Sequence, residues 1–169
     1  MSTVFVDNIS NQTGTSAMTI DTNGVVATPA RPAFSAYRDS SGVEALTGTI
    51  VFNGTRINIG NHYNTSTGKF TAPIAGLYQF NFAGFGVNSA GTVLAANSSV
   101  YATLINETTS TDLARTYMLF VSTASYPNAS FSSMVSLAAN DVVRLDVGGQ
   151  YVYSDQTDVY LTFSGYLVG

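Results

Sequence analysis

The chain has 169 residues, a net charge of −4, one histidine and no cysteine, which fits a single domain and excludes disulfide frameworks and thiolate metal sites. Only 9% of the residues are charged, against about 25% in an ordinary soluble domain, and polarity comes instead from 19 serines, 21 threonines and 13 asparagines. The six basic residues are scattered and form no patch that neutralises phosphates, so nucleic acid is excluded as a partner, and no apolar stretch is long enough for membrane insertion.

Residues 1–31 differ in composition from the rest of the chain. They hold one aromatic residue, Phe5, and Pro29 and Pro32 punctuate their end. Prolines spaced in this way favour an extended linker over a continuing sheet. We therefore expect an extended N-terminal arm over 1–31, ordered by a partner because it is too small for a core of its own, and a globular domain over 32–169. The first ten residues have no basic start and no hydrophobic run, so we expect no secretion signal.

From residue 32 onward, apolar and polar residues tend to alternate with the period of half-buried strands. The clearest run is 77–83, and further runs lie at 100–105, 129–137, 142–147 and 159–168. The wholly apolar run 117–121 predicts a strand covered on both faces. Turn-forming residues separate these runs at intervals near ten residues, which indicates an all-β sandwich, jelly roll or barrel.

Aromatic residues recur at a fixed spacing between residues 52 and 82. Phe52, Asn58, Tyr63 and Phe70 precede the block 76–82, which reads GLYQFNF. This pattern resembles the signature of the complement component 1q globular-head domain. The blocks 31–37 (RPAFSAY), 140–145 (NDVVRL) and 162–167 (TFSGYL) resemble the opening, penultimate and closing strands of that family.

The alternation by itself predicts which of these side chains are buried. Phe70, Tyr78, Phe80 and Phe82 are expected in the core, because the last three share one face of a strand. Gly76 is expected in a tight turn that requires a positive φ. These residues predict a fold and carry no chemistry of their own.

The resemblance implies a ten-stranded jelly roll similar to the tumour necrosis factor fold, assembled as a homotrimer with both termini at its base. Alternating strand directions then sort the loops. Loops near 39–43, 61–67, 87–99, 123–128 and 149–158 are expected at the apex, away from the arm. Loops near 53–55, 73–76, 107–112 and 139–141 are expected at the base.

The N-terminal segment carries a second, shorter resemblance. Residues 4–21 (VFVDNISNQTGTSAMTID) resemble the N-terminal segment of appendage proteins of tailed bacteriophages, especially those of marine cyanobacteria. The secretion signal and the collagen triplets of animal family members are absent from 1–31. The resemblance implies that the arm docks on capsid or tail proteins, and the expected virion-anchor residues are Val4, Phe5, Val6, Ile9, Met18 and Ile20.

Few residues are candidates for chemistry, and we expect no enzyme. His62 has no serine or carboxylate nearby in a triad pattern, so we assign it no catalytic role. Asp155 and Asp158 are weak calcium candidates, since oxygen ligands from three subunits could converge on the axis; the alternative is that they are solvated turn acids. No other metal or cofactor is expected, and the seven Asn-x-Ser/Thr triplets are read as unglycosylated.

Tyrosines with neighbouring amides and carboxylates suit carbohydrate or protein binding. The predicted apical binding residues are Asn88, Asn97, Tyr126, Asn128, Tyr151, Tyr153, Asp155 and Asp158. For Tyr151 and Tyr153 an alternative of equal weight is that they line the trimer axis and only hold subunits together.

The function favoured by the sequence is that of a non-enzymatic, trimeric virion surface protein of a tailed bacteriophage. It would be assembled in the host cytoplasm and would decorate the particle or bind a glycan or protein of the host surface, with avidity from three apical sites. The alternative is a soluble recognition or signalling ligand of the complement component 1q type.

Overall fold

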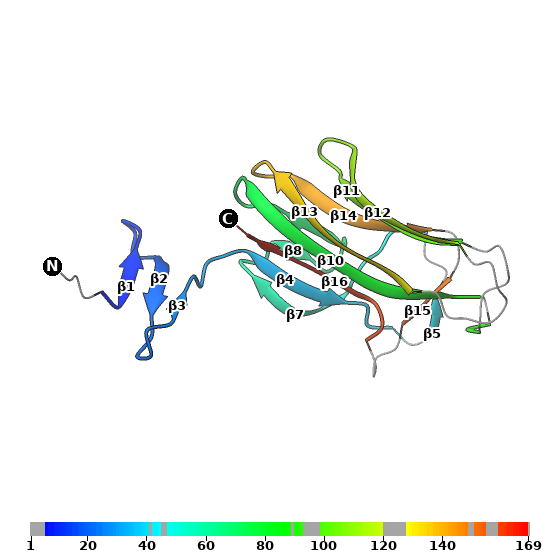
Figure 1. The fold of residues 1–169 in the computed structure, drawn as a ribbon, viewed down its shortest axis with the longest axis horizontal. Coiled ribbons are helices and arrows are strands. Elements are labelled where there is room, and N and C mark those ends of the chain that lie inside the picture. Colours follow the sequence, from blue (N-terminus) through cyan, green and yellow to red (C-terminus); the bar gives the residue numbers. More distant parts are fainter. Residues whose placement is uncertain are drawn as a thin grey trace. The chain divides into compact units, whose positions relative to one another are not determined.

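The computed structural model describes residues 6–40, 42–44, 47–88, 90–92, 99–119, 128–148, 151–154 and 159–168. The chain forms two compact units, Met1–Arg31 and Pro32–Gly169. All regular structure in the described residues is strand (Figure 1), which confirms the expected all-β class. A search of the same residues finds no helix that is long and apolar enough to cross a membrane.

The first unit is a small antiparallel sheet, which differs from the extended arm expected from its prolines (Figure 1). Its strands are β1 (Asn8–Ser10), β2 (Ser16–Ile20) and β3 (Val26–Ala27), in the order β1-β2-β3. Pro29 and Pro32 come after the last strand, so neither removes a hydrogen-bond donor from the sheet.

Side chains close both turns of this sheet. Asn11 Oδ1 accepts hydrogen bonds from the backbone nitrogens of Thr13 (3.1 Å) and Thr15 (2.9 Å). In the second turn, Asp21 Oδ1 accepts hydrogen bonds from the backbone nitrogens of Asn23 and Val25, both at 2.8 Å. This bond from the Val25 backbone lowers the pKa of Asp21. Such side-chain-to-backbone bonds form turns without any support from a core.

Two sheets face each other in the second unit, here called the head. The first sheet has the order β13-β10-β16-β4-β7. Past the end of β13, the last two residues of β10 pair with β15, and β15 pairs with β5. Its strands are β13 (Asn128–Leu137), β10 (Gly76–Val87), β16 (Thr162–Leu167), β4 (Ala33–Tyr37), β7 (Gly54–Ile59), β5 (Gly42–Glu44) and β15 (Tyr151–Ser154).

The second sheet has the order β12-β11-β14-β9-β8, and β6 also pairs with β14. Its strands are β12 (Thr111–Leu119), β11 (Ser99–Asn106), β14 (Val142–Gly148), β9 (Lys69–Thr71), β8 (Tyr63–Asn64) and β6 (Gly48–Thr49). All pairings in the head are antiparallel. Two such sheets packed face to face form a jelly-roll-like sandwich.

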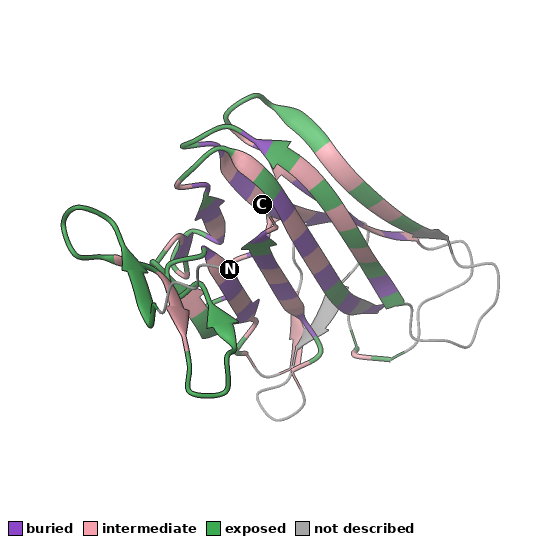
Figure 2. Ribbon diagram, turned by 60° about the vertical axis from the view of Figure 1, so that its left-hand side comes forward, coloured by how far each residue is buried: buried purple, intermediate pink, exposed green. Residues whose placement is uncertain are grey.

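The core between the sheets is built from aromatic rings. Phe34 stacks on Tyr63 with ring centroids 4.7 Å apart and meets the edge of Phe163 at 5.1 Å. Phe70, Tyr78, Phe80 and Phe82 are all buried, as the alternation predicted, and Figure 2 shows the resulting stripes of buried residues along the strands. Ring pairs of this kind stabilise a core beyond the area that they bury.

Two local expectations are wrong. Gly76 begins β10 and is not among the residues with positive φ, so its glycine is not required by a left-handed turn. Tyr117 lies on β12, an edge strand of its sheet, and its side chain is 59% exposed. The expected cover on both faces is therefore wrong at Tyr117, and the side chains of 118–121 lie outside the described residues.

The loop assignment is correct for some loops and wrong for two. Tyr37 pairs with Gly54, so the turn before β7 lies at the end of the head away from the termini, although 53–55 was expected at the base. The backbone nitrogen of Thr71 donates to the carbonyl of His62, beside the start of β14, so the segment 61–62 lies at the base. The segment between β6 and β7 crosses from the second sheet to the first, and its residues Ile50 and Phe52 are fully buried. Because of this additional crossing, β7 runs in the direction opposite to the one expected.

Candidate functional site

Four neighbouring strands on one outer face of the sandwich carry no charged residue, and β7 beside them carries Arg56, whose guanidinium carbon lies 5.4 Å from the ring centroid of Tyr37 at the end of β4. The strands β13, β10, β16 and β4 contain no aspartate, glutamate, lysine or arginine. Their register aligns outward-pointing side chains in rows across the sheet. Two neighbouring rows are Met134, Gln79, Tyr166 and Ala33, and then Ser132, Asn81, Ser164 and Ser35. We call the outward side chains of these four strands the uncharged face.

Polar groups on the uncharged face bond to one another. Gln79 Nε2 donates to Ser132 Oγ at 2.9 Å, and Ser132 Oγ donates to Asn81 Oδ1 at 2.9 Å. Large apolar groups flank this neutral network, with Tyr166 45% and Met134 54% exposed. Removing water from uncharged groups costs less than removing it from ions when the polar groups keep hydrogen-bond partners, as Gln79, Ser132 and Asn81 do. This face is therefore suited to contact with another protein surface.

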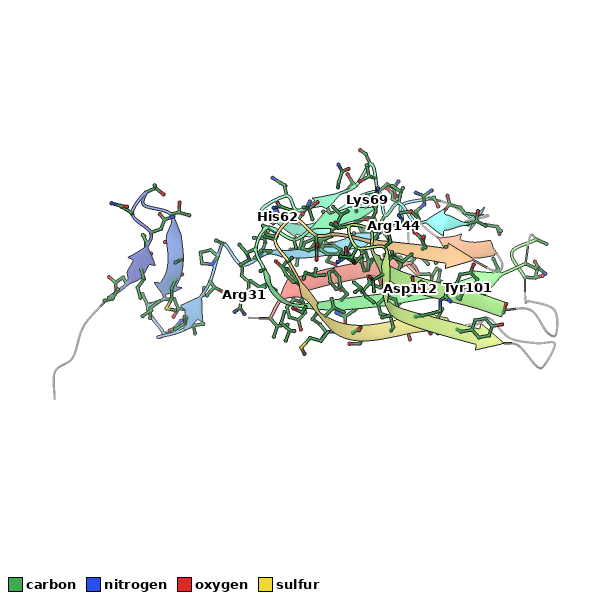
Figure 3. The ribbon with its side chains drawn as sticks, turned by 90° about the horizontal axis from the view of Figure 1, so that it is seen from above. Arg31, His62, Lys69, Tyr101, Asp112 and Arg144 are labelled. Atoms are coloured by element: carbon green, nitrogen blue, oxygen red, sulfur yellow. The ribbon has the colours of Figure 1, made fainter. Side chains whose placement is uncertain are left out.

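The opposite outer face carries several ion pairs. Its charged residues lie on β9, β12, β14 and the turn after β11, and we call this the charged face; they are Lys69, Glu107, Asp112, Arg115, Arg144 and Asp146. Arg144 pairs in register with Lys69 on the neighbouring strand, and Figure 3 shows these two side chains close together.

Acidic groups separate the two cations. Lys69 Nζ lies 2.7 Å from Glu107 Oε1, and Arg144 Nη1 lies 3.6 Å from Glu107 Oε2. The hydrogen bond from Lys69 is the main cause of a lowered pKa at Glu107. Arg144 also donates to both carboxylate oxygens of Asp146, at 3.0 and 3.1 Å, and this pair raises the pKa of the guanidinium. The network is internally neutralised and partly exposed, which suits a face that stays in water.

The described recognition candidates lie at the end of the head away from the termini. Asn128 opens β13 opposite Phe85, and Tyr151 pairs with Val87 through the backbone. Asn88 has a structural role instead, because its Oδ1 accepts from the backbone nitrogens of Ala90 and Thr92 and closes their turn.

Four of the remaining candidates cannot be placed in this way. Asn97, Tyr126, Asp155 and Asp158 lie outside the described residues, and so do the side chains of Tyr151 and Tyr153. Within the described part of the chain, no three acidic or histidine residues gather as metal ligands would. Calcium binding by Asp155 and Asp158 stays a prediction.

His62 lies on the segment before β8 (Figure 3). Its ring fills the space next to Gly60, where a Cβ atom would lie 2.3 Å from His62 Nε2. Gly60 has a φ of 77°, so the backbone of this turn favours glycine. The contact gives His62 a packing role in the turn.

Three of the expected anchor residues, Ile9, Met18 and Ile20, lie on β1 and β2 of the first unit, and Val6 comes before β1. Val6 and Ile9 are 37% and 50% exposed, and Met18 and Ile20 on β2 are half-buried. Val4 and Phe5 lie outside the described residues. Docking of these residues on a virion stays a prediction.

The division of charge between the two faces was not predicted, although a signal for it exists in the sequence. The runs 77–83, 129–137 and 162–167 contain no charged residue, whereas 142–147 contains Arg144 and Asp146. The hydrophobic alternation and the positions of charged residues, considered together, would have distinguished the strands of the uncharged face from those of the charged face.

Comparison with known proteins fits this two-sheet arrangement. Residues 33–168 match the C1q domain. The chain belongs to the C1q domain family. It is 31% identical over 152 residues to the rat (Rattus norvegicus) complement C1q tumor necrosis factor-related protein 5; the match covers 83% of the chain and 54% of that relative. The chain therefore spans about half the length of this relative.

Three solved structures share the fold. The globular domain of zebrafish complement 1qA matches with a TM-score of 0.60 and 19% identity, over 82% of this chain and 98% of that one. The Eiger TNF of S. frugiperda matches with a TM-score of 0.63 and 10% identity, over 82% and 93% of the two chains. Murine APRIL matches with a TM-score of 0.58 and 8% identity, over 82% and 99%. At these identities the similarity concerns the fold alone.

Proposed function

We propose that this C1q-domain chain acts as a trimeric, non-enzymatic recognition ligand, with the uncharged face as its subunit interface. The observation that carries the proposal is the division of charge between the two outer faces. One face holds neutral hydrogen-bonding groups and the exposed side chains of Tyr166 and Met134, and the other holds neutralised ion pairs.

Symmetry explains why the absence of charge favours self-association. Near a rotation axis, each side chain meets copies of itself or of its neighbours. A charged residue there would repel its own copy, whereas Gln79, Ser132 and Asn81 can exchange hydrogen bonds between subunits. Tyr166 and Met134 add apolar area to the same contact. Tyrosine and methionine are enriched at interfaces, while lysine and the acids are depleted.

The charged face and the loops at the far end then remain open to a binding partner. We assign recognition to the far end, where Asn128 and β15 lie, because three copies of it would point the same way. Three weak sites acting together raise apparent affinity well above that of one site.

The relatives named above favour one of the two functions derived from the sequence. They are a complement C1q/TNF-related protein, a complement 1qA domain, an Eiger TNF and murine APRIL. They support the soluble ligand ahead of the virion surface protein, and nothing in them supports capsid or tail partners for the N-terminal unit.

Two arginine substitutions test the assembly. Tyr166→Arg places a cation on the uncharged face, and Tyr117→Arg places the same cation on the opposite sheet at a tyrosine that is also exposed, 59% against 45%. We expect the unmodified chain and Tyr117→Arg to sediment as trimers and Tyr166→Arg to dissociate, because burying like charges costs several kcal/mol. A monomeric unmodified chain, or a Tyr166→Arg trimer of unchanged stability, would contradict the proposed interface.

Recognition is tested with the same proteins. Labelled wild-type, Tyr117→Arg and Tyr166→Arg chains are applied to arrays of surface glycans and extracellular proteins. We expect binding by both trimers and a loss of about 10²-fold or more for the dissociated variant. Equal binding by the monomer would show that avidity plays no part, and the absence of binding by both trimers would contradict the ligand function.

A further inference from the structure

The N-terminal sheet has one apolar side. Ile9 on β1 pairs with Met18 on β2, and Ile20 pairs with Val26 on β3. Residues that are directly opposite, or two apart on one strand, point to the same side of a sheet, so these four side chains form a single surface. We call it the apolar side of the N-terminal sheet.

The other side of this sheet is mostly polar. Asn8 pairs with Thr19, and Thr19 pairs with Ala27. The hydroxyls of Ser10 and Ser16 donate to Asn8 Oδ1, at 3.3 and 2.5 Å. Ser16 reaches this side because the pairing of β1 and β2 shifts register between Ile9 and Ser10, and such a bulge interrupts the regular alternation of side chains. The sheet is therefore amphipathic, which is typical of a sheet that covers something with its apolar side.

Within residues 6–31, nothing covers the apolar side. Ile9 is 50% and Val26 is 54% exposed, and Met18 and Ile20 are only half-buried. Three strands this short are not stable alone unless a hydrophobic side is packed against another layer. A second surface must therefore complete this unit.

We propose that this second surface is supplied by other copies of the same chain: three N-terminal sheets close over one another's apolar sides at the N-terminal end of the trimer. This inference rests on the homotrimer under Proposed function. The four residues carry no charge, so identical surfaces can meet around a three-fold axis without repulsion.

The connection to the head sets the reach of each sheet. β3 ends at Ala27 and β4 begins at Ala33. The carbonyl of Pro32 accepts a hydrogen bond from the Leu167 nitrogen at 3.0 Å, which fixes the last connecting residue to the head. Only residues 28–31 are left to connect the two units, and a stretch of four residues reaches at most about 14 Å. Three trimerised heads would hold their sheets at an effective concentration on the order of millimolar.

The size of the apolar side explains why tethering matters. A stable free pair of proteins buries roughly 800 Å² on each partner, and four side chains on a sheet of this size provide much less. The sheets are therefore expected to associate inside one trimer and not between separate trimers. The same four residues also offer too little area to bind a separate foreign protein stably.

Single cysteines provide the test, because the chain has no cysteine of its own. Val26→Cys and Ile9→Cys place a thiol on the apolar side. Ala27→Cys and Asn8→Cys are matched controls on the same strands with the opposite orientation, and all four positions are exposed. Each full-length variant is oxidised mildly and run on a non-reducing gel at two protein concentrations.

We expect disulfide-linked dimers of Val26→Cys and Ile9→Cys in about tenfold excess over the two controls, independent of tenfold dilution, as for tethered groups. Linking two of three copies leaves one free, so the yield should approach roughly two thirds of the chains. Equal cross-linking of the apolar-side variants and the controls, no cross-linking, or cross-linking that disappears on dilution would overturn the inference. So would an apolar side that is protected only when a foreign protein is added.

Sedimentation of residues 32–169 separates this inference from the proposed function. That segment contains the whole hydrophobic core, which runs from Phe34 to Leu167. A trimeric head without selective cross-linking in the full chain overturns the N-terminal contact alone. A monomeric head overturns the proposed assembly and, with it, the tether on which the contact depends.

Discussion

Gly165 lies against the ring of Phe80, and the contact leaves no room for a side chain. A Cβ atom at Gly165 would lie 2.6 Å from Phe80 Cδ1 and 2.7 Å from Phe34 Cε1. The backbone of β16 thus passes directly over two core rings. The requirement for glycine here is steric, since Gly165 is not among the glycines with positive φ.

Gly165→Ala should destabilise the head by about 1–3 kcal/mol, because an added methyl group must displace packed rings. Urea unfolding followed by far-UV circular dichroism measures the change. The neighbour Ser164 is half-buried on the outer face, so Ser164→Ala serves as the control and should change the free energy of unfolding by less than about 0.5 kcal/mol. Equal stability of the two variants would show that the rings move aside freely.

Asp141 organises the turn before β14. Its Oδ2 accepts hydrogen bonds from Asn106 Nδ2 at 2.9 Å and from the Ala138 nitrogen at 3.0 Å, and the residue is only 7% exposed. Asp141→Ala leaves both donors without an acceptor, so we expect a loss of about 1–3 kcal/mol in the free energy of unfolding. Asp112→Ala, at an exposed partner of Arg115, is the control and should cost less than about 1 kcal/mol. A loss as small as that of the control would mean that water replaces the carboxylate.

Tyr63 has a buried hydroxyl with no hydrogen-bond partner of normal geometry among the described residues. Burial raises the pKa of this hydroxyl, and the nearby Phe52 backbone offsets the rise only in part. Tyr63→Phe keeps the ring stack on Phe34 and removes the hydroxyl. At neutral pH the free energy of unfolding should stay unchanged or rise by up to about 1 kcal/mol.

The pH dependence of the same variant gives a second test. A tyrosine with a raised pKa stays neutral in the folded chain while the unfolded chain ionises near pH 10. Its contribution to stability is therefore present below that pH and is lost above it, at about 1.4 kcal/mol per pH unit. Urea unfolding between about pH 8 and 11 should show this loss in the wild type and in Tyr117→Phe, and a smaller loss in Tyr63→Phe. Identical pH profiles for wild type and Tyr63→Phe would show that the hydroxyl reaches water.

Acid should weaken the charged face. The lowered pKa of Glu107, caused mainly by the hydrogen bond from Lys69, means that its contribution exists above the ordinary glutamate range and is lost as the pH falls through the lowered value. Both side chains are about one-third exposed, so solvent limits the effect to less than about 1 kcal/mol. Glu107→Gln should reduce this acid-dependent loss, and the difference should shrink at high salt. A difference between the two proteins that is independent of salt would argue against an electrostatic origin.

Local sequence patterns predicted correctly those features that depend on a single strand. Tyr78, Phe80 and Phe82 alternate with polar residues, and alternation determines which side of a strand is buried. The N-terminal turns were also accessible. Residues 11–14 (NQTG) and 21–24 (DTNG) share an Asn or Asp three positions before a glycine, and both form side-chain-closed turns. Pro29 and Pro32 favour an extended chain only around themselves, so they do not describe the sheet over residues 8–27 that precedes them.

The wrong predictions concern features that depend on contacts between residues distant in sequence. Tyr117 looks buried within its apolar run, but it pairs with Tyr101 on the outward side of β11, and whether another layer covers that side depends on how the sheets pack. The turn at 53–55 was placed at the wrong end because Ile50 and Phe52 cross between the sheets and bury in a core that other segments provide.

The sequence by itself determined the all-β class, the core aromatic residues and the family, because each of these depends on spacing along one strand or on a linear motif. Only the tertiary structure decided that four strands without charge lie side by side, that four ion pairs gather on the opposite sheet, and that residues 6–31 form an amphipathic sheet. Strand order and register bring these groups together. Both arise from contacts between residues far apart in the chain, such as Gln79 with Ser132, whose pairing no local pattern of side chains specifies.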